Sequence, residues 1–529
     1  MKRKSVAASA AAPPKISPWI SVAIGLAAFV AYLYMAPPVS GDKDAAEWTL
    51  VLATNGIPHP TGYPLFMLLG HLFVRLAHTL GAPWPYAANA WSALGGGVAT
   101  ALLHALAARL LPAGTGRGKA LAWSALPVAL LALNPIWTVE TTLAEVYGWH
   151  VAWCLGISCV FVVTVRDLGR LSDTALLRRA ILWGALCGVG GAHHLTAIFV
   201  AVPLTAGLLL ALASARRLRA GHLLAAIAAM LVPLASYGWV AWRAFHPAGR
   251  MWPSLEPSLE SVYEHITGRV YQHNLGHFEP SQVQQWFLKL YVYPYLASGL
   301  VLLVAAFLLA RRRDERLVRG SLVVAALASA GFAFAYGVGD PSSYFLAPMA
   351  IGLAMVAPVG ARLPSRVGAI AAAAVGVLAI ALSVAWMKVD VERRRQFVSF
   401  DALVRKMWSA IPPGPGIVFW ADDMYARLVQ YQMLDGERPD LWVGHPFTLT
   451  TQGRREMFQR QFGFDPLAGL DLRVPPADSP LRPAANENLV EAIEANVNRQ
   501  TPLPVVVFDP KHLSVRLLQK GADSTHTAH

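Results

Sequence analysis

Long apolar segments recur along this chain of 529 residues, and most are close to the length that crosses a lipid bilayer. A helix rises about 1.5 Å per residue, so roughly 20 apolar residues span the hydrocarbon core. Within that core the backbone N–H and C=O groups must pair inside the protein, as a helix allows. The sequence therefore predicts an all-α polytopic membrane protein with about 11 transmembrane helices, at 19–36, 86–111, 120–136, 146–165, 180–192 (a short segment), 195–215, 221–242, 286–310, 320–337, 344–360 and 367–387.

The composition agrees with this class. Only 14% of the residues are charged, whereas soluble domains have about 25%. The basic start, "MKRKSVAASAAAPPK", precedes the first apolar segment without a short signal core and cleavage site, which indicates an uncleaved first span. Cys154, Cys159 and Cys187 all lie in apolar segments, where we expect buried thiols and not a disulfide frame or a metal site.

The net charge of +13 has two interpretations. A basic protein can bind nucleic acid, but here the basic residues lie in alternate connections between apolar segments, as the positive-inside rule requires of cytoplasmic loops. We therefore expect no nucleic-acid partner and a cytoplasmic N-terminus. The basic residues are Lys2, Arg3 and Lys4; Arg117 and Lys119; Arg166, Arg170, Arg178 and Arg179; Arg216, Arg217 and Arg219; Arg311, Arg312, Arg313, Arg316 and Arg319; and Arg362 and Arg366.

This orientation depends on the segment 65–80, "LFMLLGHLFVRLAHTL". Counted as a span, it would place every later arginine cluster outside. As a helix it puts His71, Arg75 and His78 on one face, which is typical of an amphipathic helix in the membrane interface. We predict the interfacial helix, with a short tilted span as the alternative. The outer face then carries 37–85, 137–145, 193–194, 243–285, 338–343 and the tail from 388.

The last part of the chain, 388–529, is more polar. Its short β-rich runs "GIVFW", "DLWV" and "PVVVF" alternate with helical stretches. We predict a small C-terminal α/β domain on the outer face, after a transmembrane domain at 1–387 whose outer loops are 37–85 and 243–285.

Unusual polar residues gather at the predicted outer ends of the spans. Ionisable groups at membrane depth tend to face the bundle interior or a wet cavity. Several loops that supply acids and histidines at one level therefore predict a single site. These residues are Asp42, Asp44, Glu47 and His59 after the first span, Glu140, Glu145 and Tyr147 after the third, His193 and His194 after the fifth, and Asp340 after the ninth.

Each of these residues also has an ordinary structural explanation. A lone acid such as Asp44 is often just solvated, and "IPHPTGYP" is a sharp turn in any case. Glu145 can extend to the interface, and the histidine pair 193–194 can be packed and hydrogen-bonded. No spacing of His and Asp resembles a closed metal site, so the sequence supports no metal or other cofactor, and a divalent ion stays an open alternative.

The polar residues suit one chemistry better than others. Phosphate-binding loops, serine-nucleophile elbows and zinc-protease motifs are missing from the sequence. A carboxylate can accept a proton from an attacking hydroxyl, and cationic donors such as Arg243, Arg250 and Arg269 of the large outer loop can stabilise a leaving phosphate. This favours transfer of a sugar from a lipid phosphate to a hydroxyl acceptor. A transporter or lipid flippase, and a non-catalytic scaffold, are the alternatives; a transporter would require charges near mid-membrane and usually a repeat.

The stretch "DKDAAEWTLVLATNGIPHPTGYPLFMLLG" resembles the N-terminal signature of a bacterial membrane family first catalogued as a domain of unknown function. That family is similar to protein O-mannosyltransferases and is grouped with the GT-C glycosyltransferases. Thr61 stands where the family has a second proline, and Ala45-Ala46 where it has Ser-Gly, which leaves the substrate preference open. The matching residues are Asp44, Glu47, His59, Pro60, Gly62, Tyr63, Pro64 and Leu65, then Trp137 with Glu145-Val146-Tyr147, "HHLT" at 193–196, "HITGRVY" at 265–271, and Asp340 with Tyr344-Phe345-Leu346.

The resemblance implies a GT-C fold and an inverting enzyme of the bacterial inner membrane. It implies a polyprenyl-phosphate-linked, mannose-like sugar as donor and a protein, glycan or lipid hydroxyl as acceptor, with membrane lipids around it. Asp44 would be the general base and Asp42 a competing candidate, while Glu47 would orient the acceptor or raise the pKa of Asp44 through like charge. The substrate cavity would be lined by Asp42, His59, Gly62, Tyr63, Glu145, Tyr147, His193, His194, Arg269 and Asp340.

Overall fold

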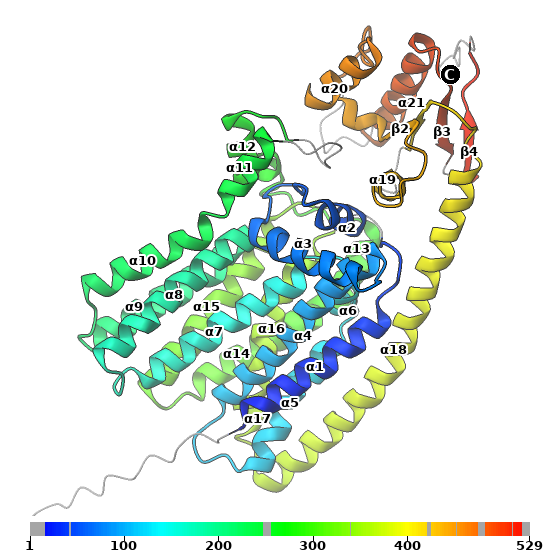
Figure 1. Cartoon of the computed structure of the whole chain (residues 1–529). Helices are drawn as coiled ribbons and strands as arrows, with labels where there is room; N and C mark the ends of the chain where they lie inside the picture. The colour runs from blue at the N-terminus through cyan, green and yellow to red at the C-terminus, as the bar shows by residue number, and fades with distance from the viewer. Residues whose placement is uncertain are drawn as a thin grey trace, which may run out of the picture.

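The computed structural model describes residues 16–41, 44–246, 255–338, 340–420, 425–450, 452–473, 482–509 and 512–520. Figure 1 shows a helical bundle with a small sheet region beyond one of its ends. Its helices are α1 (Pro18–Met35), α2 (Asp44–Thr54), α3 (Pro64–Thr79), α4 (Trp84–Leu110), α5 (Arg117–Ala132), α6 (Pro135–Thr142), α7 (Tyr147–Asp167), α8 (Asp173–His193), α9 (Ile198–Ser214), α10 (Ala220–Leu234), α11 (Tyr237–Phe245), α12 (Leu259–Thr267), α13 (Gln282–Phe287), α14 (Tyr293–Leu308), α15 (Arg313–Ala335), α16 (Leu346–Ala354), α17 (Val356–Gly360) and α18 (Ser365–Ser409).

The predicted membrane spans are confirmed. Among the described residues, ten helices are long and apolar enough to cross a membrane, and α5 with α6 forms an eleventh, bent by 77°. The bend has a local cause, because Asn134 caps α6 through its side chain and Pro135 occupies the first helical position. The segment predicted at 180–192 is longer than expected. Helix α8 begins at Asp173, where the Ser172 side chain accepts a hydrogen bond from the Ala175 backbone.

Segment 65–80 forms the separate helix α3, and it is not among the candidate spans. In Figure 1, α2 and α3 lie across the end of the bundle that is nearest the sheet region. Helix α3 packs Phe66 and Met67 inward and leaves Leu69 and Leu72 more than half exposed. An exposed leucine face on a helix beside the bundle end fits the predicted position in the membrane interface.

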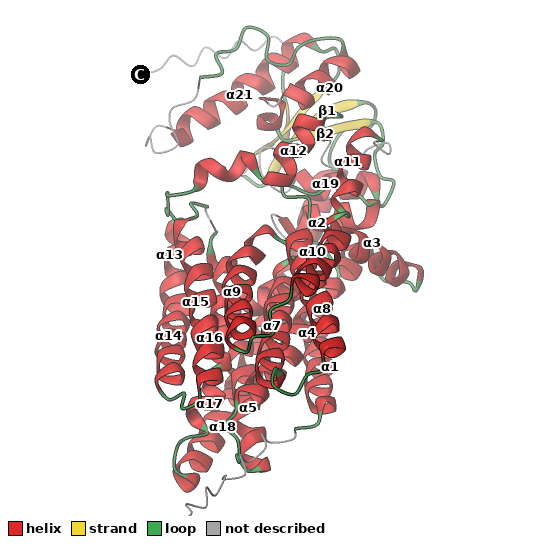
Figure 2. Ribbon diagram, turned by 90° about the vertical axis from the view of Figure 1, so that its left-hand side faces the viewer, coloured by secondary structure: helices red, strands yellow, loops and turns green. Residues whose placement is uncertain are grey.

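The sheet region confirms the predicted α/β tail (Figure 2). Its four strands have the order β2-β1-β3-β4, with β1 parallel to β2 and β3, and β3 antiparallel to β4. Helix α18 connects it to the bundle and continues through residue 387 to Ser409. Its elements are β1 (Gly416–Phe419), α19 (Tyr425–Met433), β2 (Leu441–Gly444), α20 (Gln452–Phe462), α21 (Arg482–Gln500), β3 (Val505–Asp509) and β4 (Ser514–Leu517).

Helix α19 holds the connection between α1 and α2. Arg427 is almost fully buried, pairs with Asp401 of α18 at 2.9 Å, and donates to the backbone carbonyls of Ser40 and Gly41. Gln430, one turn later, accepts from the Ser40 hydroxyl and donates to the Ala46 carbonyl. These contacts hold Ser40 and Gly41, between α1 and α2, and Ala46 in the first turn of α2.

We expect Arg427→Met to destabilise the folded protein by about 3 kcal/mol, because it leaves the buried Asp401 carboxylate with Arg405 as its remaining ion-pair partner. The thermal unfolding midpoint of the purified protein measures this. Arg473→Met is the control, since Arg473 forms an exposed pair with Asp471 and should change the midpoint little. Equal midpoints for the two variants would contradict the role of Arg427.

Candidate active site

A cavity of about 560 Å³ lies at the end of the bundle that carries α2 and α3. It is bounded by the polar connection between α2 and α3, the starts of α7 and α9, the short helical turn Arg269–Asn274, and the segment from the end of α15 to Tyr344. The residues that line it are Asp44, Glu47, His59, Pro60, Thr61, Tyr63, Tyr147, His194, Leu195, Thr196, Ile198, Phe199, Thr267, Gly268, Tyr271, Gln272, Leu275, Phe332, Tyr336, Val338, Asp340 and Tyr344.

Asp44 and Glu47 lie in the first turn of α2, where the helix dipole favours negative charge. Both carboxylate oxygens of Glu47 contact His59. The Oε1 atom accepts a hydrogen bond from the His59 backbone N–H at 2.5 Å, and the Oε2 atom lies 3.1 Å from the ring atom Nδ1. The His59 ring also contacts Trp48, with centroids 5.0 Å apart. The pair therefore attaches the connecting turn to the first turn of α2.

The charge of this pair follows from its surroundings. Burial by itself lowers the pKa of His59, but the Glu47 carboxylate, its hydrogen bond and the nearby Asp44 carboxylate together raise this pKa to about 9. At neutral pH His59 is therefore an imidazolium ion paired with Glu47. The sequence suggested that Glu47 acts on Asp44 through like charge, whereas in the structure its direct partner is His59.

The turn "IPHPTGYP" directs the chain into α3. Gly62 has φ +85° and Tyr63 has φ +43°, so both adopt the left-handed conformation, and Pro64 then begins the helix. A side chain on Gly62 would also be close to Val240 and to the His265 ring. The Tyr63 hydroxyl lies 3.4 Å from Nε2 of His59, which places it beside the Glu47–His59 pair.

Asp44, Glu47 and His59 are also arranged so that one ligand atom from each lies within 4.8 Å of the others. Such a group can hold a divalent cation with oxygen and imidazole ligands. Metal binding through His59 requires its neutral form, however, and the observed pair with Glu47 favours the protonated form. A neutral His59 can hold a metal ion on Nε2 while its Nδ1–H donates to Glu47, whereas the imidazolium form has no free ring nitrogen for a metal ion.

The wall facing the carboxylates is rich in tyrosine. Tyr344 contacts two other tyrosines edge to face. Its ring centroid is 5.6 Å from that of Tyr147 and 5.2 Å from that of Tyr336. His194 packs against this group, and its Nδ1 atom accepts from the Thr196 backbone. Tyr147 and His194 were predicted as site residues, whereas Tyr271 and Tyr336 were not. The available signals were the motif "HITGRVY", which contains Tyr271, and the place of Tyr336 at the end of a predicted span.

More carboxylates lie around the cavity. Asp340 lines it, and Ser342 donates a hydrogen bond to its carboxylate. Glu145 is not among the lining residues; burial first, then the charges of Glu140, Asp44 and Asp340, raise its pKa well above the usual range. These surroundings favour the neutral form of Glu145.

Four residues predicted to line the cavity do not. Gly62 shapes the turn, Glu145 lies in the connection between α6 and α7, and His193 packs against Phe66 with ring centroids 5.8 Å apart. Arg269 is mostly exposed and pairs with Glu264 at 3.1 Å, because it follows the end of α12 on the solvent side. Asp42 falls outside the described residues. No lysine or arginine is among the described residues that line the cavity.

The N-terminal third of the chain, residues 44–217, matches the family model of the protein O-mannosyl-transferase TMEM260 N-terminal domain. This confirms the resemblance to O-mannosyltransferase-like proteins drawn from the motifs around Asp44 and His59. No curated protein matches the chain significantly.

Solved structures share the fold over nearly the whole chain. ArnT from Cupriavidus metallidurans bound to undecaprenyl phosphate is 15% identical, with a TM-score of 0.55 and 94% of both chains covered. Its apo form has a TM-score of 0.54 at 13% identity, with 94% of this chain and 93% of ArnT covered. The oligosaccharyltransferase AglB from Archaeoglobus fulgidus, in complex with an inhibitory peptide and a dolichol-phosphate, has a TM-score of 0.51 at 11% identity, over 93% of this chain and 69% of AglB. The chain thus has the GT-C glycosyltransferase fold.

We expect the Glu47–His59 pair to make stability depend on pH. The folded-state pKa of His59, about 9, exceeds the ordinary value of 6.5. The contribution of the pair to the free energy of unfolding is therefore fully present below pH 6.5 and is lost as the pH rises through about 9. The difference in unfolding midpoint between the wild type and His59→Gln should shrink over this interval. His512→Gln, in an exposed pair with Asp509, is the control. A difference that stays constant from pH 6 to pH 10 would contradict the charged pair.

Proposed function

Because the chain has the GT-C fold, we propose that this protein is a glycosyltransferase that moves a mannose-like sugar from a polyprenyl-phosphate donor to a hydroxyl acceptor. The observation that carries the proposal is the cavity in which Asp44 lies beside the Glu47–His59 pair and opposite a wall of tyrosines. GT-C enzymes with lipid-linked donors need no nucleotide-binding motif, and this sequence shows none.

The arginine clusters support an orientation with this cavity on the outer face. Arg117, Arg166, Arg217 and Arg313 lie in or beside connections at the bundle end opposite α2 and α3. By the positive-inside rule that end is cytoplasmic, so the cavity and the sheet region lie outside the bacterial inner membrane.

The lining also supports a donor that arrives from the membrane. Ile198 and Leu195, at the start of α9, line the cavity and are 56% and 40% exposed. With Phe199 and Phe332 they form an apolar edge next to the polar part of the cavity. A prenyl chain can lie along this edge while its phosphate and sugar reach Asp44. ArnT with undecaprenyl phosphate and AglB with dolichol-phosphate show that the fold accepts such lipids in other proteins.

In the proposed reaction, the acceptor hydroxyl oxygen attacks the anomeric carbon while Asp44 takes the hydroxyl proton. The bond from the anomeric carbon to the phosphate oxygen breaks, and polyprenyl phosphate leaves. A single displacement inverts the anomeric configuration. Protonated His59 and the tyrosine hydroxyls are the donors next to the developing phosphate charge, a role that arginine often has in other phosphate sites.

We expect Asp44→Asn to abolish transfer, with a loss of at least about 10²-fold, because the amide accepts no proton at neutral pH. The assay uses purified protein with polyprenyl-phosphate sugars and measures sugar release. Asp471→Asn, in an exposed pair with Arg473, should keep full activity. Full activity of Asp44→Asn, with an unchanged unfolding midpoint, would exclude Asp44 as the base.

We also expect transfer at neutral pH to continue in the presence of EDTA, because the imidazolium form of His59 leaves neither ring nitrogen free to bind a metal ion. The rate should be unchanged after chelation and dialysis. Loss of activity that returns on addition of Mn²⁺ or Mg²⁺ would show instead that the Asp44, Glu47 and His59 cluster holds a metal ion.

A further inference from the structure

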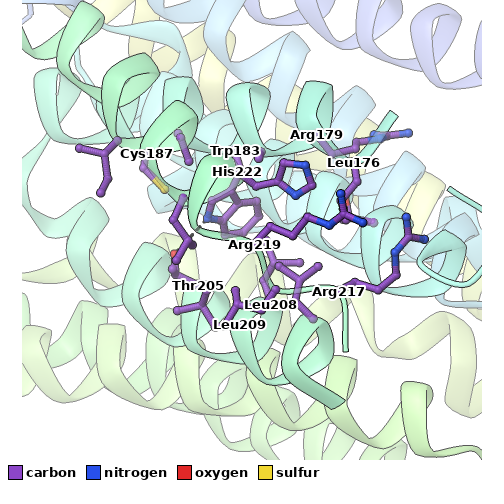
Figure 3. Close-up of a pocket in the computed structure, with 18 of the residues that line it drawn as sticks. Leu176, Arg179, Trp183, Cys187, Thr205, Leu208, Leu209, Arg217, Arg219 and His222 are labelled. Carbon is purple, nitrogen blue, oxygen red and sulfur yellow. Dashed lines mark hydrogen bonds between the residues drawn. The ribbon is translucent and has the colours of Figure 1, made fainter. Parts of the chain in front are cut away.

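A second cavity, of about 290 Å³, lies between α8, α9 and α10 and reaches Arg217 and Arg219 in the connection between α9 and α10 (Figure 3). Its interior is apolar, with Leu176 and Trp183 from α8, Leu208 and Leu209 from α9, and Leu223 and Ile227 from α10. It shares no lining residue with the cavity beside Asp44.

This cavity is at the edge of the bundle. Helix α10 packs mainly on α8, where Gly184 and Gly188 let the backbones of Ala226 and Met230 come close. No residue of α10 is fully buried, and Ile227, which lines the cavity, is 51% exposed. Helix α10 is therefore at the periphery of the bundle, where a membrane-spanning protein meets lipid.

One side of the cavity is strongly basic. Figure 3 shows Arg179, Arg217 and Arg219 together on this side, with His222 next to them and Cys187 at the opposite end. No aspartate or glutamate is among the described residues that line it.

These basic groups are only partly neutralised. Arg217 donates to the Leu168 and Leu171 carbonyls, and both Arg217 and Arg219 pair with the single carboxylate of Asp173. For Arg179 and His222 the described part of the chain provides no side-chain hydrogen bond or ion pair. Three guanidinium groups thus face one carboxylate, which leaves positive charge beside an apolar cavity.

We propose that this cavity binds an anionic phospholipid, with one acyl chain between α9 and α10 and the headgroup phosphate on Arg179 and Arg219. Burying a hydrocarbon chain in the apolar interior is favourable, and guanidinium groups bind phosphate through charge-assisted hydrogen bonds. The surplus of positive charge selects an anionic lipid over a zwitterionic one.

The test is lipid retention by the purified full-length protein, measured by native mass spectrometry with phosphatidylglycerol, phosphatidylcholine of the same chains, and undecaprenyl phosphate. Two variants change the cavity: Arg179→Gln removes the charge without a partner, and Ala180→Phe fills the apolar space from α8. Arg178→Gln is the matched control, because Arg178 is exposed and does not line the cavity.

We expect the wild type and Arg178→Gln to retain phosphatidylglycerol equally and in preference to phosphatidylcholine. Arg179→Gln should bind it about fivefold more weakly, the effect of one basic group near a lipid phosphate, and Ala180→Phe should lose it. The proposal is overturned if Arg178→Gln and Arg179→Gln behave alike, if phosphatidylcholine binds equally well, or if undecaprenyl phosphate displaces phosphatidylglycerol at a lower concentration. Because Arg179→Gln changes only a partly exposed side chain, it keeps the test valid if Ala180→Phe does not fold.

Discussion

The two contacts of Glu47 with His59 determine the geometry of the cavity beside Asp44. They join the first turn of α2 to the turn that starts α3, through one backbone and one side-chain interaction. Asp44 lies one helical turn before these contacts, and Arg427 binds the carbonyls of Ser40 and Gly41, which precede α2 in the chain. The chain on each side of α2 is thus held by a buried or partly buried charged group.

The membrane spans, the separate helix α3 and the C-terminal sheet were all predictable. Hydrophobic length and the alternation of arginines are properties of neighbouring residues, so the sequence displays them directly. The start of α8 was misjudged by seven residues because Arg178 and Arg179 interrupt the apolar pattern, although their long side chains let the helix continue past them.

The interactions across long sequence distances were not predictable. Nothing near Arg427 indicates that it binds the carbonyls of Ser40 and Gly41, because the contact depends on how α18 carries the sheet region back over the bundle. Arg269 was chosen for its charge and its place in a family motif, yet it pairs with Glu264 on the solvent side. Tyr336 was missed as a site residue because a tyrosine near a span end is common at membrane interfaces, and Tyr271 was missed although it belongs to the motif at 265–271.

The most direct test of a lipid-linked sugar donor is a structure of the protein in lipid nanodiscs with undecaprenyl phosphate bound. We predict the phosphate in the cavity beside Asp44, within hydrogen-bond distance of His59 or a tyrosine hydroxyl, and the prenyl chain along Ile198 and Phe199. A lipid phosphate bound only elsewhere, with the cavity beside Asp44 closed to it, would contradict a lipid-linked sugar donor.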